Sequence, residues 1–320
     1  MMAYQRREYP QWSWSFSRLQ TFEACKRVYY YHYYASHNGW ERNAPSLAAA
    51  AYRLKKLTNL YTALGDAVHQ TAQLAVERLA LGKPLMAVGE IEERIREKMR
   101  SVWQWSVSGR QQFIQRPNQV PMLHEFYYGQ GPTQDVVDRI NDRIGKCAHG
   151  LAASLTLAEL AEGRGEVIAC EQFDTFELYG TQVFAVPDLV YRSQLERYLI
   201  VDWKTGRQEE QNLEQVALYG LYAHAKLGVD PEEIVVRLEY LDAGSVVELA
   251  LNGEMLAVVR ERAQKSMAEM RGYLADVELN QAKPQHAFPL AENRSQCLRC
   301  NFLELCAEEL RIDLAAVSTR

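Results

Sequence analysis

The chain has 320 residues, of which 48% are hydrophobic and 24% charged, which is ordinary for a globular protein with a substantial core. Its net charge of −5 excludes a broadly basic surface, so any binding of nucleic acid would depend on a local basic region. Because no apolar run is long enough to span a membrane and the N-terminal segment lacks a secretory pattern, we expect a cytoplasmic protein with no membrane partner.

The first predicted helix covers residues 12–34 and begins at a capping serine, either Ser15 or Ser17. It is rich in aromatic residues and contains Cys25, which two basic residues follow. Aromatic side chains beside basic ones can form a stacking platform for single-stranded nucleic acid. Such residues more often form a hydrophobic core, which we favour here. Residues 38–59 are predicted to form a loop and a short helix.

An amphipathic helix is predicted over residues 64–82, ended by Gly82 and Pro84. His69 lies in the first turns of this helix, four residues after Gly65. A lone histidine on a helix is more often structural than a metal ligand, so this helix by itself leaves its role open.

The region over residues 89–163 is predicted to be mostly helical, with a loop at residues 116–132. Its basic residues are candidate phosphate contacts. They are interleaved with acids, which favours a solvated surface instead. The candidates are Arg94, Arg96, Lys98, Arg100, Arg139, Arg143 and Lys146.

A sheet is predicted to begin at Gly165 with a strand over residues 166–178. Two further strands follow, over residues 184–191 and 198–203, and a polar turn joins them. We expect these two strands to be neighbours in the sheet.

Each of these two strands contains an acid among apolar residues: Asp188 in the first and Asp202 in the second. Charged groups in apolar strands are unfavourable unless something compensates their charge. Because side chains alternate along a strand, Asp202 and Lys204 share one face, where Asp188 can join them. These groups could hold a divalent cation with bound water, or Lys204 could form a buried ion pair with one aspartate.

A helix is predicted over residues 212–227, where Gln215 and Tyr219 lie on one face because they are four residues apart. Two strands, over residues 234–241 and 245–251, then pair across a turn. A long helix over residues 253–277 follows.

Three cysteines near the C-terminus form the pattern C-x-x-C-x5-C. Six cysteines in a chain of this length favour metal ligands or buried thiols over disulfides. Three thiolates in so short a segment indicate a bound metal, with Cys25 the candidate for the fourth ligand. A four-cysteine site holds either zinc or an iron–sulfur cluster. The three cysteines are Cys297, Cys300 and Cys306.

The two strands with the aspartates resemble the signature of the PD-(D/E)XK nuclease superfamily. The matching residues are Pro187, Asp188, Asp202, Trp203 and Lys204. The Thr205-Gly206 that follows completes DWKTG, a form typical of the RecB-like branch. Two further motifs are similar to that branch: its G-x-x-x-H helix, ending here at His69, and its Q-x-x-x-Y motif, here Gln215 and Tyr219.

The four cysteines resemble the [4Fe–4S] site of AddB-type and CRISPR-associated RecB-like nucleases, and we favour this cluster over zinc. Cys25 would supply the remote ligand, with Lys26 in the place where the family usually has a proline. A proline is not a ligand, so this departure leaves the site intact. Cys147 and Cys170 have no part in it.

The resemblance implies a role for each of these residues. The implied metal ligands are His69, Asp188, Asp202 and the carbonyl of Trp203. The implied catalytic residues are Asp188, Asp202, Lys204, Gln215 and Tyr219. Glu171 resembles an acid placed on the preceding strand, where it would be a metal ligand or a neighbour of one, although a plain surface glutamate is an equal alternative.

The implied fold is α/β, with a central mixed sheet flanked by helices, a restriction-endonuclease-like core, a helical insertion and a C-terminal iron–sulfur clasp. We expect an N-terminal helical part over residues 1–88 and the insertion over residues 89–164. The nuclease core would cover residues 165–290, and residues 291–320 would close on Cys25.

The implied function is that of a Mg2+- or Mn2+-dependent deoxyribonuclease, an exonuclease acting on DNA ends or single strands. The chain has no nucleotide-binding loop of a motor, so a helicase or another repair or defence protein would act in trans. The alternatives are an endonuclease of a defence or mobile-element system and a non-catalytic DNA-binding subunit of a helicase–nuclease complex.

Overall fold

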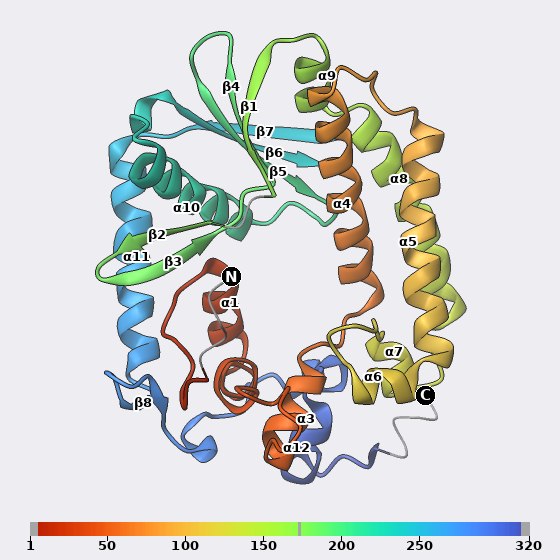
Figure 1. The fold of residues 1–320 in the computed structure, drawn as a ribbon, viewed down its shortest axis with the longest axis vertical. Coiled ribbons are helices and arrows are strands. Elements are labelled where there is room, and N and C mark those ends of the chain that lie inside the picture. Colours follow the sequence, from red (N-terminus) through yellow and green to blue (C-terminus); the bar gives the residue numbers. More distant parts are fainter. Residues whose placement is uncertain (1–5, 172–173, 315–320) are drawn as a thin grey trace. The chain divides into compact units, whose positions relative to one another are not determined.

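The computed structural model of the chain describes residues 6–171 and 174–314 (Figure 1). They form two compact units. The first unit consists of the residues up to Asn59, Val102–Pro132 and the residues from Lys265 on. The second unit consists of Leu60–Ser101 and Thr133–Gln264. Each unit is therefore assembled from separate stretches of the chain, and the four consecutive segments expected from the sequence stay a prediction.

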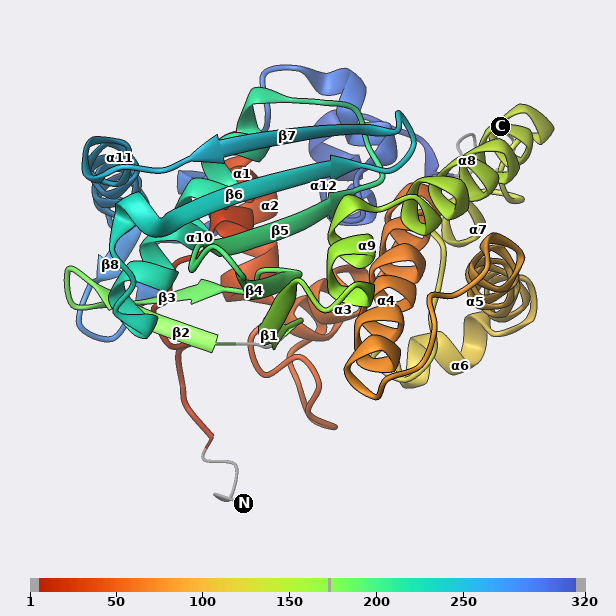
Figure 2. The ribbon, with the colours of Figure 1, turned by 90° about the horizontal axis from the view of Figure 1, so that it is seen from above.

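The second unit is built on a five-stranded mixed sheet with the strand order β1-β4-β5-β6-β7 (Figure 2). β5 and β6 pair in parallel, and the other neighbouring strands are antiparallel. β5 and β6 are largely buried on both faces, as their nearly continuous apolar sequences require. The strands are β1 (Gly165–Cys170), β4 (Leu189–Ser193), β5 (Tyr198–Lys204), β6 (Ile234–Tyr240) and β7 (Ser245–Ala250).

Helices cover both faces of this sheet. On one face, Ser154, which caps α9 (Leu155–Ala161), contacts the ring of Trp203. On the other face, α10 (Glu210–Leu227) contacts the side chain of Lys204. Trp203 and Lys204 are adjacent in β5, so their side chains point to opposite faces. The expected α/β fold with a central mixed sheet flanked by helices is confirmed.

α4 (Leu60–Ala80) packs against α8 (Gln134–Ala152) and α9, and it contacts β1. Its buried residues recur at spacings of three and four, which places them on one side of the helix. α4 includes the whole of the expected helix up to Ala80 and begins four residues earlier. η2 (Pro231–Glu233) leads from α10 into β6.

Two expected strands are each divided in the structure. The strand expected over residues 184–191 is split into β3 (Thr181–Ala185) and β4, because Pro187 interrupts it and cannot donate a backbone hydrogen bond. β3 pairs with β2 (Asp174–Leu178) in a separate two-stranded sheet. The strand expected over residues 166–178 likewise becomes β1 and β2, and its residues 172–173 lie outside the described part of the chain.

The first unit contains the helices of the N-terminal segment. The single helix expected over residues 12–34 is wrong, because Cys25 has an extended backbone, with φ −163° and ψ 116°, that ends one helix and begins the next. Ser15 caps the first of them by accepting a hydrogen bond from the amide of Arg18, as predicted. The elements are α1 (Phe16–Ala24), α2 (Lys26–Tyr30), the π-helix η1 (Tyr31–Ala35) and α3 (Ser46–Leu54).

A hydrophobic core joins these helices to the segment after residue 290 in the same unit. Tyr31, Leu54 and Phe302 belong to one buried cluster, and Arg27 forms an ion pair with Glu309 at 2.7 Å. Most aromatic residues of the N-terminal segment are buried, which confirms the core interpretation for them. The remaining elements of the unit include α6 (Arg110–Gln115), α7 (His124–Tyr127), η3 (Gln285–Ala287), η4 (Arg294–Arg299) and α12 (Leu303–Leu310).

Two long helices contribute residues to both units: α5 (Val88–Ser108) and α11 (Gly253–Arg271). α11 ends six residues before the expected end, and β8 (Leu274–Asp276) and β9 (Gln281–Ala282) form a small ribbon after it. None of the described helices is both long and apolar enough to cross a membrane.

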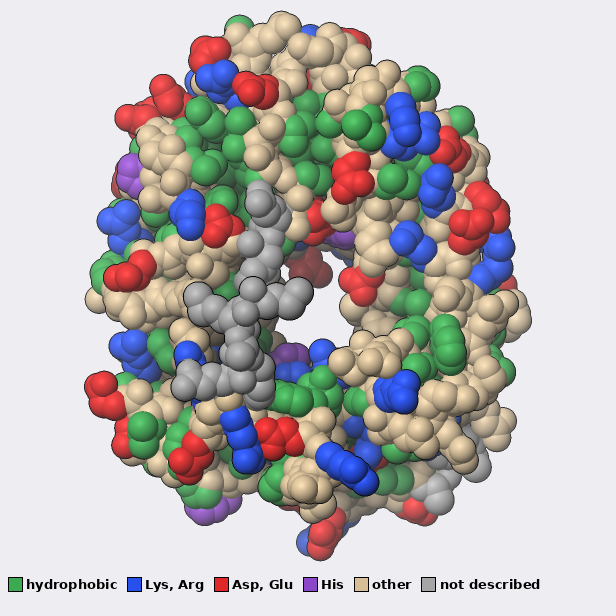
Figure 3. Space-filling view, in the orientation of Figure 1, with side chains coloured by type: hydrophobic (Ala, Val, Ile, Leu, Met, Phe, Trp, Pro, Cys, Tyr) green, Lys and Arg blue, Asp and Glu red, His purple; other side chains and the backbone are tan. Residues whose placement is uncertain are grey.

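Basic residues of α5 and α8 form ion pairs with acids one helical turn away, as expected of a solvated face. The pairs are Arg94–Glu90, Arg96–Glu92, Arg139–Asp135 and Lys146–Asp142. Acidic and basic side chains are also interspersed over the face shown in Figure 3.

Candidate active site

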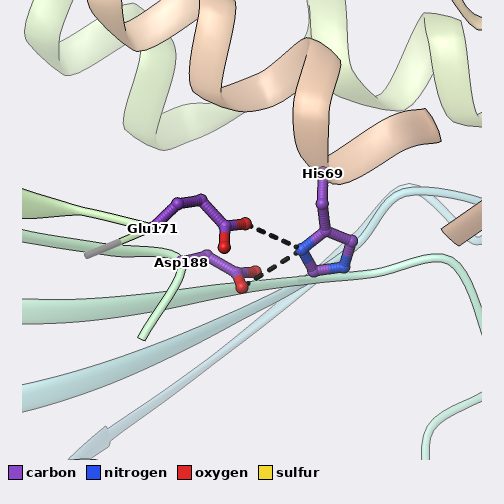
Figure 4. A group of neighbouring side chains, drawn as sticks. All are labelled: His69, Glu171 and Asp188. Carbon is purple, nitrogen blue, oxygen red and sulfur yellow. Dashed lines mark hydrogen bonds and ion pairs between the residues drawn. The ribbon is translucent and has the colours of Figure 1, made fainter. Parts of the chain in front are cut away.

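Three possible metal ligands from three elements meet in the second unit (Figure 4). His69 projects from α4, Glu171 directly follows β1, and Asp188 directly precedes β4. Nδ1 of His69 lies 3.1 Å from Oδ1 of Asp188 and 3.3 Å from Oε1 of Glu171. One ligand atom of each residue lies within 4.8 Å of the other two. An imidazole nitrogen and carboxylate oxygens suit Mn2+ or Mg2+, so these residues fit a divalent cation.

The register of two neighbouring strands brings the two acids together. Cys170, the last residue of β1, pairs with Leu189, the first residue of β4. The next residues outward are Glu171 and Asp188, and the amide of Glu171 donates a 3.0 Å hydrogen bond to the carbonyl of Asp188. Glu171 has a left-handed backbone with φ 46°, which is unfavourable for glutamate by about 1 kcal/mol. Backbone strain of this kind gathers at functional sites.

The second aspartate and the lysine lie one strand further on. Asp188 and Asp202 are only 5% and 2% exposed. Oδ2 of Asp188 accepts a 2.7 Å hydrogen bond from the backbone amide of Trp203. Nζ of Lys204 lies 2.7 Å from Oδ2 of Asp202, in an ion pair. The alternation expected along this strand therefore places Asp202 and Lys204 side by side.

A hydrogen-bonded chain extends from Lys204 into α10. Nζ of Lys204 donates to Oε1 of Gln215 at 2.8 Å, and Nε2 of Gln215 donates to the hydroxyl of Tyr219 at 2.9 Å. The structure thus brings the Q-x-x-x-Y pair to the lysine, which fixes the position of its ammonium group.

Burial and nearby charges raise the pKa values of three groups at the site, Asp202, His69 and Tyr219. Burial raises the pKa of Asp202 to about 6, and the charge of Asp188 adds to this, while Lys204 opposes it. Burial disfavours a charged His69, but the Asp188 and Glu171 carboxylates outweigh burial and raise its pKa well above the usual value. Burial, with the charges of Asp202 and Asp188, also raises the pKa of Tyr219. A carboxylate that raises the pKa of a neighbouring acid, as Asp188 does for Asp202, marks a place where a cation is favoured.

The opposite face of β5 holds Trp203 in place. Nε1 of Trp203 lies 3.2 Å from Oε2 of Glu239 and 3.4 Å from Oγ of Ser154. Oε1 of Glu239 accepts hydrogen bonds from the amide and the hydroxyl of Thr156, at 2.9 and 2.6 Å. Sequence reasoning missed Glu239. The signal was present, because Arg237 and Glu239 are charged residues two apart in an apolar strand, like Asp202 and Lys204.

Arg143 was a candidate phosphate contact, and the structure gives it another partner. Its guanidinium donates to the carbonyl of Thr205, directly after Lys204, and lies 3.3 Å from a carboxylate oxygen of Asp242. Arg143 therefore supports the loop that follows the lysine.

The four cysteines expected to share a metal all lie in the first unit. Cys25 lies at the break between α1 and α2, Cys297 in η4, Cys300 directly after it, and Cys306 in α12. Burial raises the pKa of the Cys300 thiol to about 12; a hydrogen bond from the Phe302 amide opposes this, and Cys306, Cys25 and Cys297 contribute to the rise.

The spacing of the thiols can be compared with the two metal groups considered. A zinc ion with Zn–S distances of about 2.3 Å holds its four sulfurs about 3.8 Å apart. Among the described cysteines, no three sulfur atoms all lie within 4.8 Å of one another. Which of the two groups these cysteines would hold stays a prediction. Cys147 and Cys170 lie in the second unit.

A buried aspartate pair beside a lysine on a mixed sheet, with a histidine and a glutamate at the same point, could hold the divalent cation that metal-dependent hydrolysis requires. The family comparison agrees with this class: the model of the PD-(D/E)XK nuclease superfamily matches residues 13–307. The chain belongs to this superfamily, and membership implies metal-dependent nuclease activity.

Among the solved structures that the chain is similar to is the crystal structure of SSO0001, with 12% identity and a TM-score of 0.29. The match covers 65% of this chain and 80% of that chain. No curated protein matches the chain.

Proposed function

We propose that the protein is a Mg2+- or Mn2+-dependent deoxyribonuclease of the RecB-like branch, an exonuclease that acts on DNA ends or single strands. The observation that carries the proposal is the meeting of His69, Glu171 and Asp188 beside the buried pair of Asp202 and Lys204. The hydrogen bond from Lys204 to Gln215 supports the assignment to the RecB-like branch, because it connects the Q-x-x-x-Y motif of that branch to the lysine of the site.

The metal ligands would be His69, Asp188, Asp202 and the carbonyl of Trp203, with Glu171 as a further ligand. A bound Mg2+ or Mn2+ ion would polarise the scissile phosphate and lower the pKa of a bound water molecule.

The remaining residues act through position and charge. Hydrolysis forms a bond from a water oxygen to phosphorus and breaks the bond to the leaving oxygen. Lys204 would orient the water and stabilise the negative charge that develops on the phosphate. Gln215 holds the Lys204 ammonium, and Tyr219, whose raised pKa keeps it neutral, holds Gln215. The Trp203 amide fixes the Asp188 carboxylate.

Two other functions remain as alternatives. A non-catalytic DNA-binding subunit has no need for acids and a lysine in buried strands, where their desolvation is unfavourable. An endonuclease would use the same residues and differs only in cleaving circular DNA. A helicase or another repair or defence protein acting in trans is part of the proposal.

We further propose that Cys25, Cys297, Cys300 and Cys306 hold a [4Fe–4S] cluster. The influence of the other three thiols on the pKa of Cys300 supports this assignment, as does the location of all four cysteines in the first unit and of the other two in the second. Hydrolysis of a phosphodiester transfers no electrons, so the cluster would be structural.

The catalytic proposal is tested with end-labelled and circular DNA, single- and double-stranded, in the presence of Mg2+, Mn2+ or EDTA. We expect Asp202→Ala or Lys204→Ala to lower metal-dependent cleavage by about 100-fold or more, because each removes charge at the reacting phosphate. Asp142→Ala and Lys146→Ala, which alter an exposed ion pair of α8, are the matched controls. Full cleavage by both Asp202→Ala and Lys204→Ala, with unchanged thermal melting, would contradict the active-site assignment. Cleavage of circular DNA would favour the endonuclease.

A further inference from the structure

A group of aromatic and basic side chains lies in the first unit. The Trp40 patch consists of Trp40, Tyr52, Lys55 and Lys56. Trp40 lies in the loop between η1 and α3, and Tyr52 lies on α3, which packs on η1. The ring centroids of Trp40 and Tyr52 are 5.6 Å apart, and Nζ of Lys55 and of Lys56 lie 5.9 and 5.5 Å from the Tyr52 ring centroid.

The patch accumulates positive charge. Among the described residues neither ammonium group forms an ion pair, and Lys55 donates only to the carbonyl of His32, at 3.3 Å. Glu41, next to Trp40 in sequence, forms an ion pair with Arg6 at 3.0 Å. Burial lowers the pKa of Lys55 to about 8, with a further contribution from Lys56. This differs from the basic residues of α5 and α8, which have acidic partners.

A structural role explains part of the patch. Lys55 and Lys56 follow the C-terminal end of α3, where the helix dipole favours cations. The dipole does not explain why Trp40 remains 44% exposed beside them. An exposed ring next to ammonium groups that have no acidic partner among the described residues is the combination with which proteins bind unpaired bases and their phosphates.

We propose that the Trp40 patch binds single-stranded DNA, with a base stacked on Trp40 and with Lys55 and Lys56 contacting phosphates. The face of a base is accessible only when the base is unpaired, so the patch favours single strands over duplexes. The inference rests on the proposed function, because it takes the ligand to be the substrate of the nuclease.

The test measures binding of a fluorescently labelled thymidine oligonucleotide to the full-length protein without added divalent metal. We expect Trp40→Ala to weaken binding by at least about fivefold, the lower end of what one stacked base contributes. Trp105→Ala is the matched control, since Trp105 is also 44% exposed and lies in the same unit.

The lysines are tested through the salt dependence of binding. Removing two phosphate contacts in Lys55→Ala/Lys56→Ala should lower the slope of log affinity against log salt by about 1.4. Lys55→Arg/Lys56→Arg should retain the slope, because the charges remain. Lys83→Ala/Lys265→Ala removes two exposed lysines elsewhere and should behave like the wild type.

Two outcomes would overturn the inference: patch variants that bind like their controls, or a duplex that binds as tightly as the single strand.

Cleavage assays distinguish a failure of this inference from a failure of the proposed function. We expect the patch variants to raise the KM for single-stranded DNA and leave kcat unchanged. If the wild type cleaves DNA and the patch variants keep full affinity, the binding role of the Trp40 patch is refuted and the nuclease proposal stands. If the protein binds DNA through the patch but does not cleave it with Mg2+ or Mn2+, the nuclease proposal is refuted and the binding role of the patch stands.

Discussion

The two carboxylate oxygens of Asp188 have different partners. Oδ1 lies 3.1 Å from Nδ1 of His69, and Oδ2 accepts a 2.7 Å hydrogen bond from the Trp203 amide. The amide fixes the plane of the carboxylate, so Oδ1 stays directed toward the other ligands. Hydrogen bonds of this kind orient metal ligands before the metal arrives.

His69 is predicted to contribute to metal binding more than to folding. His69→Ala should raise the Mn2+ concentration needed for half-maximal cleavage, by about 10-fold or more, because one ligand is lost. The effect should depend on pH. The raised pKa of His69 means that Mn2+ must displace a proton from the wild-type site, so wild-type affinity rises with pH.

The measurement is a Mn2+ titration of cleavage at several pH values. In His69→Ala the proton competition at this position is gone, so its metal requirement should change less with pH than that of the wild type. His149→Ala, on the exposed side of α8, is the control. An identical titration for His69→Ala and the wild type at every pH would make His69 a structural residue.

At the scale of elements, β5 is held from both faces. α10 reaches Lys204 through Gln215, and Glu239 of β6 links Trp203 to the start of α9 through Thr156. Hydrogen bonds to elements on both faces of the sheet therefore hold β5 in position.

Glu239→Ala is predicted to destabilise the protein by about 3 kcal/mol, because it leaves buried donors of Thr156 and Trp203 without an acceptor. Glu239→Gln keeps an acceptor oxygen and should cost less. The free energy of unfolding in urea measures both. Glu166→Ala removes an acid that is exposed and paired with Arg192, and should cost at most about 1 kcal/mol. Equal values for Glu239→Ala and Glu166→Ala would show that the network behind Trp203 contributes nothing.

The element scale also shows what could be predicted from sequence. Alternation along an apolar strand was sufficient to predict the shared face of Asp202 and Lys204, and spacing on a helix was sufficient for Gln215 and Tyr219. The strand register that joins Glu171 to Asp188 was not predictable, since it depends on which strands pair. The helix break at Cys25 was also missed, because the residues on both sides favour a continuous helix.

At the scale of the whole molecule, the cysteine group joins segments from opposite ends of the described chain. Protein contacts already connect them: Arg27 pairs with Glu309, and the hydroxyl of Tyr31 donates to the carbonyl of Leu305 at 3.1 Å. A cluster on Cys25 and the three later cysteines would add a further connection, which restricts the unfolded chain.

The cluster prediction concerns colour and stability together. Protein purified without oxygen should be brown and contain about four irons per chain. Cys25→Ser should bleach it and lower the melting temperature by roughly 6–12 °C, as expected for the loss of about 3 kcal/mol. Cleavage should then be lost through unfolding, whereas Asp202→Ala should stay brown and stable but inactive.

Cys147→Ser and Cys170→Ser are the controls, because both residues lie in the second unit and should leave the colour unchanged. A colourless native protein with one zinc per chain would refute the iron–sulfur assignment. Colour that survives Cys25→Ser would show that Cys25 is not a ligand.

The division of the chain between the units has a consequence for synthesis on the ribosome. The second unit is complete at Gln264, whereas the first unit still lacks its residues from Lys265 on. A growing chain can therefore fold the second unit before Cys297, Cys300 and Cys306, the proposed partners of Cys25, have been synthesised. Iron would be needed only late in synthesis. When the supply of iron is short, newly made chains would lack this connection between their two ends and would have the lowered stability expected of Cys25→Ser.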